Sequence, residues 1–234
     1  MTHAAFNLLA FDTSTEQLSV AVQRAADGRR LTHQGAGGAQ ASATLIPTVQ
    51  RLLTEAGLAL GDLHAIVFGR GPGSFTGVRT ACAVAQGLGF GAGVPLLPVN
   101  TLWAVAEEAR EHTGARQVYA VLDARMDQVY AGRYEFDSKL SSIDGGSSLT
   151  SPEFLELGPG WLLAGNALDA YGARLPQGPR FACRPTATAL VRLAPGLLAS
   201  GAAVPPEQAL PLYIRDKVAK TTLERQADAA TRAA

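Results

Sequence analysis

Two segments of this chain begin in the same way, although they lie far apart in the sequence. Asp12 ends a short apolar run, and so does Asp123. The residues four, five and six positions later also correspond: Glu16, Gln17 and Leu18 after the first aspartate, Asp127, Gln128 and Val129 after the second. In both places the chain turns directly into another strand. We interpret this similarity as a weak sign of internal duplication, with two α/β halves that meet near residues 100–115.

The hydrophobic periodicity predicts alternating strands and helices. Strands are expected over 8–11, 18–22, 31–34, 65–68, 96–99, 118–122, 127–136 and 161–164, and helices over 45–56, 76–90, 102–112, 151–157 and 186–200. Pro47 should lie in the first turn of its helix or kink it. We therefore predict an α/β fold of duplicated βββαβα units, with an N-terminal domain over 1–102, a C-terminal domain over 103–214 and a polar tail over 215–234.

The composition is that of a globular chain without a strong preference for a charged partner. Of 234 residues, 47% are apolar and 17% charged, which excludes a disordered chain. The 20 basic and 20 acidic residues balance, so no overall attraction to nucleic acid or anionic lipid is expected. Cys82 and Cys183 are isolated, as expected for reduced thiols. The segment 80–99 is interrupted by glycines and two prolines, which argues against a membrane span. No signal peptide is seen, so we expect a soluble, cytoplasmic protein without a membrane partner.

The most distinctive local pattern is the glycine-rich segment 69–77, which joins a predicted strand to a predicted helix. Glycines allow close backbone approach, and a helix N-terminus attracts anions, so this segment could hold a phosphate. A tight structural turn explains it equally well. The turn that follows Asp12 has the same ambiguity, and an ordinary hairpin turn is favoured there. Neither segment matches a Walker loop or a dinucleotide fingerprint. The candidate residues of two vestigial phosphate loops are Asp12, Ser14, Gly71, Gly73 and Ser74, and no cofactor is expected.

Most catalytic machinery has no counterpart in this sequence. The four histidines, at positions 3, 33, 64 and 112, form no H-x-x-x-H pair, so no metal site is predicted. There is no G-x-S-x-G motif and no cysteine beside a histidine, so nucleophilic hydrolysis has no visible residues. We predict no catalytic residue. The cationic side chains of the tail alternate with acidic ones, which favours a solvated segment over a nucleic-acid patch.

Helix 76–90 carries small or apolar residues on more than one side. It could be buried within its own domain, or its outer face could meet a partner subunit together with the apolar helix at 41–56. The predicted interface residues are Leu45, Val49, Leu52, Ala56, Ala81, Ala85 and Leu88. Some of them must also cover the chain's own sheet, and the sequence leaves open which face each helix presents.

Four segments together resemble the TsaB (YeaZ-like) family. They are L-A-F-D-T-S-T at 9–15, G-P-G-S-F-T-G-V-R at 71–79, L-D-A-R-M at 122–126 with V-Y at 129–130, and P-L-Y-I-R at 211–215. The resemblance covers nearly the whole chain. It implies the actin/Hsp70/sugar-kinase (ribonuclease-H-like) fold of two duplicated α/β domains. It also implies a role in making threonylcarbamoyladenosine beside the tRNA anticodon.

The resemblance further implies a non-catalytic subunit. The catalytic paralogue TsaD carries an H-x-x-x-H metal motif, and Thr101 and Val105 occupy those positions here, where neither can replace an imidazole. The implied partners are TsaD, the ATPase subunit TsaE and a second copy of this chain when it is alone. Transfer RNA would be reached only through the complex, so we expect weak binding by the isolated chain. The alternative function is an ATP-binding phosphotransferase or ATPase of the same fold. A metalloprotease is disfavoured because the ligands are missing.

Overall fold

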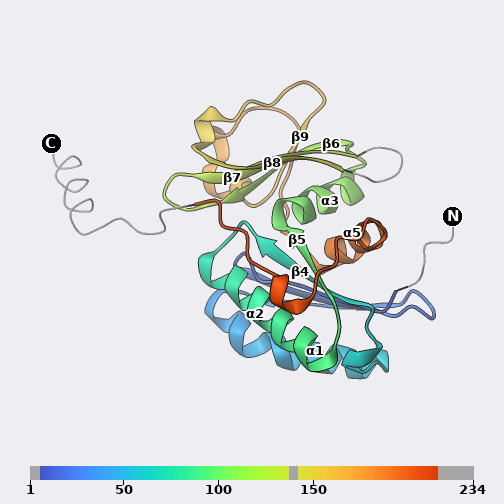
Figure 1. Cartoon of the computed structure of the whole chain (residues 1–234). Helices are drawn as coiled ribbons and strands as arrows, with labels where there is room; N and C mark the ends of the chain where they lie inside the picture. Colours follow the sequence, from blue (N-terminus) through green and yellow to red (C-terminus); the bar gives the residue numbers. More distant parts are fainter. Residues whose placement is uncertain (1–5, 137–141, 216–234) are drawn as a thin grey trace, which may run out of the picture.

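The computed structural model describes residues 6–136 and 142–215, and these form two five-stranded sheets with the same strand order (Figure 1). The first sheet has the order β3-β2-β1-β4-β5, and the second has the order β8-β7-β6-β9-β10. The first comprises β1 (Leu8–Asp12), β2 (Gln17–Gln23), β3 (Arg30–Ala36), β4 (Ala65–Gly71) and β5 (Leu96–Asn100). The second comprises β6 (Gln117–Asp123), β7 (Val129–Phe136), β8 (Ser142–Thr150), β9 (Leu162–Ala164) and β10 (Arg180–Phe181).

The pairing within the two sheets confirms the duplication expected from the two aspartate turns. β1 pairs antiparallel with β2 and parallel with β4, and β6 pairs antiparallel with β7 and parallel with β9. Each half thus starts with a meander of three strands and adds two parallel strands on the other side. The chain therefore has the predicted duplicated α/β fold, of the actin-like and sugar-kinase-like type.

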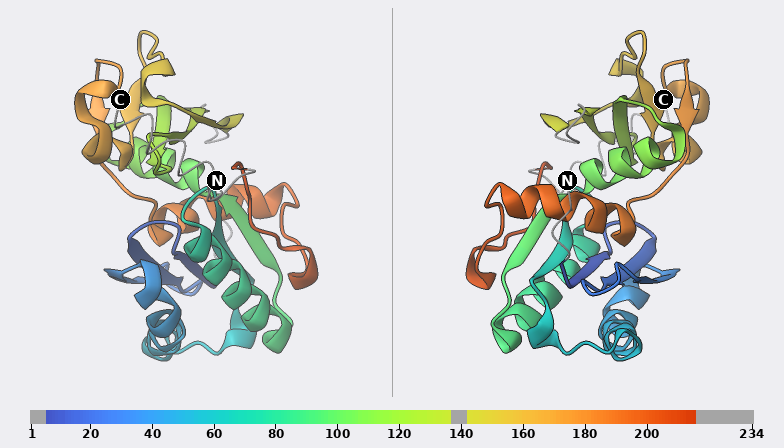
Figure 2. Two further views of the ribbon diagram at one scale, coloured as in Figure 1. Left: turned by 90° about the vertical axis from the view of Figure 1, so that its left-hand side faces the viewer. Right: turned by 90° about the vertical axis from the view of Figure 1, so that its right-hand side faces the viewer.

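Each half contributes one helix that packs on the sheet of the other half. Helix α3 (Thr101–Thr113) follows β5 of the first sheet but packs against β6 and β7. Helix α5 (Ala187–Ala199) follows the second sheet but packs against β1 and β2. The two helices contact each other between the sheets, as the side views in Figure 2 show for α5 in orange. This exchange joins the halves through apolar cores on both sides.

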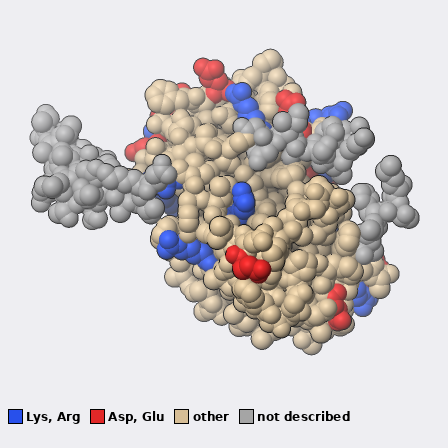
Figure 3. Space-filling model, viewed as in Figure 1, with Lys and Arg blue, Asp and Glu red and all other residues tan. Residues whose placement is uncertain are grey.

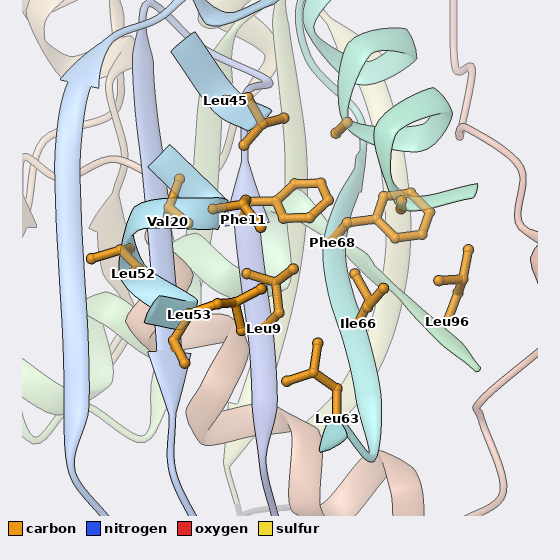
Figure 4. Close-up of a cluster of buried hydrophobic side chains, with 14 of the residues drawn as sticks. Leu9, Phe11, Val20, Leu45, Leu52, Leu53, Leu63, Ile66, Phe68 and Leu96 are labelled. Carbon is orange, nitrogen blue, oxygen red and sulfur yellow. The ribbon is translucent and has the colours of Figure 1, made fainter. Parts of the chain in front are cut away.

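Helices α1 (Ala41–Ala56) and α2 (Phe75–Ala92) cover the opposite face of the first sheet. Figure 4 shows the resulting core, in which leucines of α1 lie against apolar side chains of β1, β2 and β4. Six residues that we had assigned to an interface belong to this core and are at most 3% exposed: Leu45, Val49, Leu52, Ala56, Ala81 and Ala85. Leu88 is partly buried and packs against the same cluster. The six buried side chains face the chain's own sheet, so an interface on α1 and α2, which stays a prediction, would have to use the other sides of these helices.

Polar side chains cap the helices where the sequence places them. Ser74 accepts the Gly77 N–H at the start of α2, Asn100 accepts the Leu102 N–H at the start of α3, and Thr186 accepts the Ala189 N–H at the start of α5. These bonds satisfy N–H groups that have no partner within the helix. Three long helices end at a glycine with a left-handed backbone, namely Gly57, Gly93 and Gly114.

Several boundaries differ from those predicted. Helix α1 begins at Ala41, so Pro47 lies inside it rather than in its first turn. The sequence analysis did not identify β8, the helix α4 (Ala167–Tyr171) or β10, and only a short 3₁₀ turn at Pro152–Phe154 replaces the predicted helix over 151–157. Of the tail predicted over 215–234, residues 216–234 lie outside the described residues. None of the helices in the described ranges combines the length and apolarity needed to cross a bilayer.

A buried ion-pair network joins the two central helices. The Glu107 side chain of α3 is 3% exposed and accepts hydrogen bonds from Arg110 Nε at 2.7 Å and from Arg192 Nε at 2.9 Å. Arg192, on α5, also donates to Glu108 at 2.7 Å. Removing one partner of such a pair leaves a charge buried without full compensation.

We predict that Arg192→Ala lowers the free energy of unfolding by about 3 kcal/mol, because Glu107 and Glu108 stay buried with fewer donors. The matched control is Arg51→Ala. Arg51 pairs with Glu55 on the exposed surface of α1 at 2.7 Å, and this change should cost only about 0.5 kcal/mol. Urea denaturation of both variants measures the difference. Equal costs would contradict the role of the buried network in joining the halves.

Candidate functional site

The two duplicated aspartates end their strands in the same local structure, and the turns that follow them line one cavity. Asp12 Oδ1 accepts the N–H of Ser14 at 2.8 Å, and Asp123 Oδ1 accepts the N–H of Arg125 at 2.8 Å. Between the two turns lies a cavity of about 440 Å³. Its lining comes from both halves and from the C-terminal segment, and includes Ser14, Glu16, Gly73, Ser74, Phe75, Asp123, Arg125, Met126, Tyr130, Asn166, Tyr213 and Arg215. A volume of this size is in the range of small-molecule sites.

Asp12 itself is fully buried at the bottom of this region. Its carboxylate accepts the Ser14 N–H and, at 2.6 Å, the Ser14 hydroxyl, and Thr101 Oγ1 lies 3.5 Å from Oδ2. Burial raises the pKa of Asp12 to about 6, although these hydrogen bonds lower it in part. A carboxylate that binds a metal–phosphate group must be ionised and open to it. Asp12 is instead enclosed by its own chain.

The glycines of segment 69–77 are explained by close contact with the turn after β1. A Cβ on Gly73 would lie 2.6 Å from Ser14 Cβ and from the Ser14 carbonyl oxygen. A Cβ on Gly69 would collide with the Asp12 carboxylate, and one on Gly77 with the Thr13 carbonyl. At such distances no side chain larger than hydrogen fits. The glycine-rich pattern is therefore required by packing between the two turns.

Hydrogen bonds also join these two turns directly. The Ser74 N–H donates to the Ser14 carbonyl at 2.7 Å, and the Thr13 hydroxyl donates to the Gly77 carbonyl at 2.7 Å. The Ser74 N–H and the Thr13 hydroxyl are the kind of donors that a phosphate held between these turns would need. The five predicted residues lie together, and several of their donors are used within the chain: the Ser14 N–H and hydroxyl by Asp12, the Ser74 N–H by Ser14 and the Gly71 N–H by Thr101. The close contact leaves little room for a phosphate between the turn after β1 and the glycine segment.

The positions of the paralogue's metal ligands are also used structurally. The Thr101 hydroxyl accepts the Gly71 N–H at 3.1 Å beside Asp12, and Val105 is fully buried in the core between α3 and the second sheet. Within the described ranges, no group of three or more His, Cys, Asp or Glu side chains could hold a metal ion.

Glu16 and Asn166 also line the cavity, and neither was predicted from the sequence as a site residue. Glu16, in the turn after β1, pairs with Arg184 at 2.5 Å and lies 3.4 Å from the Asn166 amide. Burial opposes ionisation of Glu16, but these donors outweigh it and lower its pKa. Asn166 also accepts the Asp123 N–H at 3.0 Å. Glu16 and Arg184 are too far apart in the sequence for a local pattern to predict their ion pair. The topology of the fold brings them together.

The front of the cavity is bordered by a C-terminal segment that touches both halves. The Leu212 N–H donates to the Arg70 carbonyl at 2.7 Å, and the Tyr213 hydroxyl accepts from Arg79 Nε at 2.8 Å. Three residues after Leu212 in the sequence, Arg215 Nη2 donates to the Ala124 carbonyl of the second half at 3.0 Å. The P-L-Y-I-R motif therefore forms a strap across the cavity mouth.

We predict that Asp12→Asn removes a pH dependence of stability without unfolding the protein. Because the folded pKa is raised from 3.8 to about 6, the wild type is most stable with Asp12 protonated and loses stability as the pH rises through 6. The loss is about 3 kcal/mol at most, from about 2 pKa units. Asparagine keeps the shape and carries no charge. Denaturant unfolding at pH 4 and pH 7 measures both proteins, and identical pH slopes would show that Asp12 is not the group responsible.

Three comparisons with known proteins agree with this architecture. The family model described as TsaD, tRNA N6-adenosine threonylcarbamoyltransferase, matches residues 32–176. TsaB of Escherichia coli strain K12, a tRNA threonylcarbamoyladenosine biosynthesis protein, is 35% identical over 225 residues, which are 91% of this chain and 96% of that protein.

Two solved structures from Pseudomonas aeruginosa are also similar. YeaZ has a TM-score of 0.82 at 42% identity and covers 89% of this chain and 99% of its own. An uncharacterized protein with similarity to peptidase YEAZ has a TM-score of 0.83 at 41% identity, covering 90% of this chain and 100% of its own. The resemblance inferred from the four motifs is thus confirmed, and the chain belongs to the TsaB (YeaZ-like) family.

Proposed function

We propose that this chain acts in the biosynthesis of threonylcarbamoyladenosine in tRNA, as a non-catalytic subunit that pairs with the catalytic paralogue TsaD. The pathway is supported by the name of the E. coli relative. The non-catalytic role is supported by one observation: Asp12 is fully buried and enclosed, and the turns at 12–15 and 71–77 are hydrogen-bonded to each other. A chain that uses these residues for its own structure would contribute to the reaction through a partner.

The outer faces of α1 and α2 are the surfaces we assign to that partner. Ile46 on α1 is 42% exposed and Phe90 on α2 is 61% exposed. The exposed side of α2 carries Phe75, Thr76 and Arg79 in its first turns and small residues farther along, at Ala83, Gly87 and Gly91. A Cβ on Gly87 or Gly91 would meet no other atom within 4 Å, so the chain's own fold does not require glycine at either position. The small residues of α2 allow the backbone of another helix to approach closely, and Ile46 and Phe90 offer apolar side chains for it to cover.

Further partners follow from the same proposal. TsaE would join as the ATPase subunit, tRNA would be reached through the complex, and the same helix faces would pair two copies of this chain when TsaD is absent. The proposed location is the cytoplasm, where tRNA is modified.

An ATPase or phosphotransferase is the second candidate, because the cavity between the two aspartate turns lies between the halves of a kinase-like fold. The two functions differ in one simple measurement, the turnover of ATP by the purified chain alone. We expect no turnover above a buffer blank. Turnover that Asp12→Asn abolishes would favour the enzyme.

We predict that Ala83→Arg prevents pairing with TsaD while the isolated chain stays folded. Ala83 is exposed on α2, so the new side chain costs little in the free chain, but a charge buried at a close helix contact costs about 3 kcal/mol or more, about a hundredfold in affinity. Co-purification of tagged TsaD with each variant measures pairing, and thermal melting measures folding.

Two matched variants make this test decisive. Ala199→Arg places the same charge at an exposed position of α5, far from α1 and α2, and should pair normally. Ala85→Arg, two residues from Ala83 but fully buried, should unfold the chain. Normal pairing by Ala83→Arg would place the partner elsewhere on the molecule.

A further inference from the structure

Three of the exposed large apolar side chains surround the mouth of the cavity. Phe75 at the start of α2 is 40% exposed, Met126 in the turn after β6 is 47% exposed, and Tyr213 in the strap is 48% exposed. All three belong to the cavity lining. Exposed aromatic side chains gathered at one place mark a surface that meets another molecule.

Arg79 links two of these side chains into one stacked group. Its guanidinium carbon lies 3.6 Å from the centre of the Phe75 ring and 5.6 Å from the centre of the Tyr213 ring. The two rings are 6.0 Å apart at an angle of 36°. Arg79 Nε also donates to the Tyr213 hydroxyl at 2.8 Å. The planes of the stack are thus held in place, while the outer edges of the rings stay exposed.

The arginines around this stack lack acidic partners. Elsewhere in the described chain, arginines on both halves pair with carboxylates, among them Arg24, Arg51, Arg110, Arg174, Arg184 and Arg192. Arg70, Arg79 and Arg215 form no ion pair with any described carboxylate. Figure 3 shows basic side chains over the N-terminal end of α2, with an acidic group beside them. The arginines of the stack are thus available to an anionic ligand, although the chain as a whole is neutral.

We propose that this arginine–aromatic surface, formed by Phe75, Arg79, Met126, Tyr213 and Arg215, binds single-stranded RNA. Arginines without carboxylate partners attract phosphates, and exposed aromatic rings stack on unpaired bases. Sequence-tolerant binding of single strands uses this combination. The proposal rests on the proposed function, since a tRNA-modifying complex meets an RNA whose reactive loop is unpaired. The proposed protein interface lies farther along α2, from Ala83 to Gly91, and on the outer face of α1.

The expected affinity of the isolated chain is low. Two arginines neutralise about two phosphates. The logarithm of the binding constant should then fall against the logarithm of the salt concentration with a slope of about −1.4 for a single strand. This agrees with the weak binding expected from the zero net charge. In the complex, the surface would add to contacts made by the other subunits.

The test is fluorescence anisotropy of the full chain with a labelled, unstructured 12-nucleotide RNA, and with a hairpin duplex as competitor, at several salt concentrations. Arg79→Gln should weaken binding about fivefold and reduce the salt slope by about 0.7, the share of one phosphate. Phe75→Leu keeps an apolar side chain but loses the ring, and should weaken the single strand about fivefold with an unchanged slope. Arg29→Gln removes the same charge from the exposed turn between β2 and β3 and should change little. Thermal melting confirms that each variant is folded.

Three results would overturn the proposal. The first is no binding of the single strand by the wild type, or a duplex that binds equally well. The second is an equal loss of RNA affinity in Arg79→Gln and Arg29→Gln, which would show that the RNA responds only to the overall charge of the protein. The third is loss of TsaD pairing by Arg79→Gln and Phe75→Leu with RNA binding unchanged, which would make this surface a protein interface. A failure of the proposed function is distinguishable from a failure of this proposal. The proposed function is tested by co-purification of TsaD with Ala83→Arg, and that measurement does not involve RNA.

Discussion

The direct contact between the turn after β1 and the glycine segment before α2 determines most of what this molecule can do. At Gly69, Gly73 and Gly77 the two segments approach so closely that a Cβ does not fit. The contact buries Asp12, fixes the start of α2 through Ser74 and pairs the Thr13 hydroxyl and the Ser74 N–H within the chain. The hydrogen bonds of these turns therefore stabilise the protein itself. The cavity lies in front of them, between the two aspartate turns.

The duplication explains the rest of the architecture, and the differences between the two copies explain the assignment of surfaces. Both halves share the strand order, the aspartate turn and a helix that crosses to the other sheet. Among residues 6–136 and 142–215, the first sheet alone carries two long helices on its outer face, whereas the second carries the short α4 and a 3₁₀ turn there. Long helices with exposed small residues are suited to helix–helix pairing. The partner surface is therefore proposed on the first half alone.

The sequence predicted the fold better than it predicted the surfaces. Strand periodicity and the repeated aspartate were local signals, and both led to the observed sheets. Asp12 and Ser74 were also expected in one site, because each lies where a strand ends or a helix begins. The side of each interface helix that meets the sheet was not predicted, because α2 is small or apolar on both sides and periodicity cannot tell them apart. The Glu16–Arg184 pair and the Phe75–Tyr213 stack join residues far apart in sequence, and no local pattern reports such contacts. Strand β8 was missed since its polar, glycine-containing sequence lacks an apolar alternation.

The central claim is that the residues around Asp12 serve structure and that this chain supports a catalytic partner. The most direct measurement is the rate of threonylcarbamoyl transfer to tRNA by TsaD and its other required components, reconstituted with wild-type chain, with Asp12→Asn or without this chain. We expect little transfer without the chain and an unchanged rate with Asp12→Asn, since the variant keeps the fold and the outer faces of α1 and α2. A rate that falls a hundredfold or more with Asp12→Asn, while pairing and melting temperature are preserved, would show that this carboxylate takes part in the reaction and would contradict the claim.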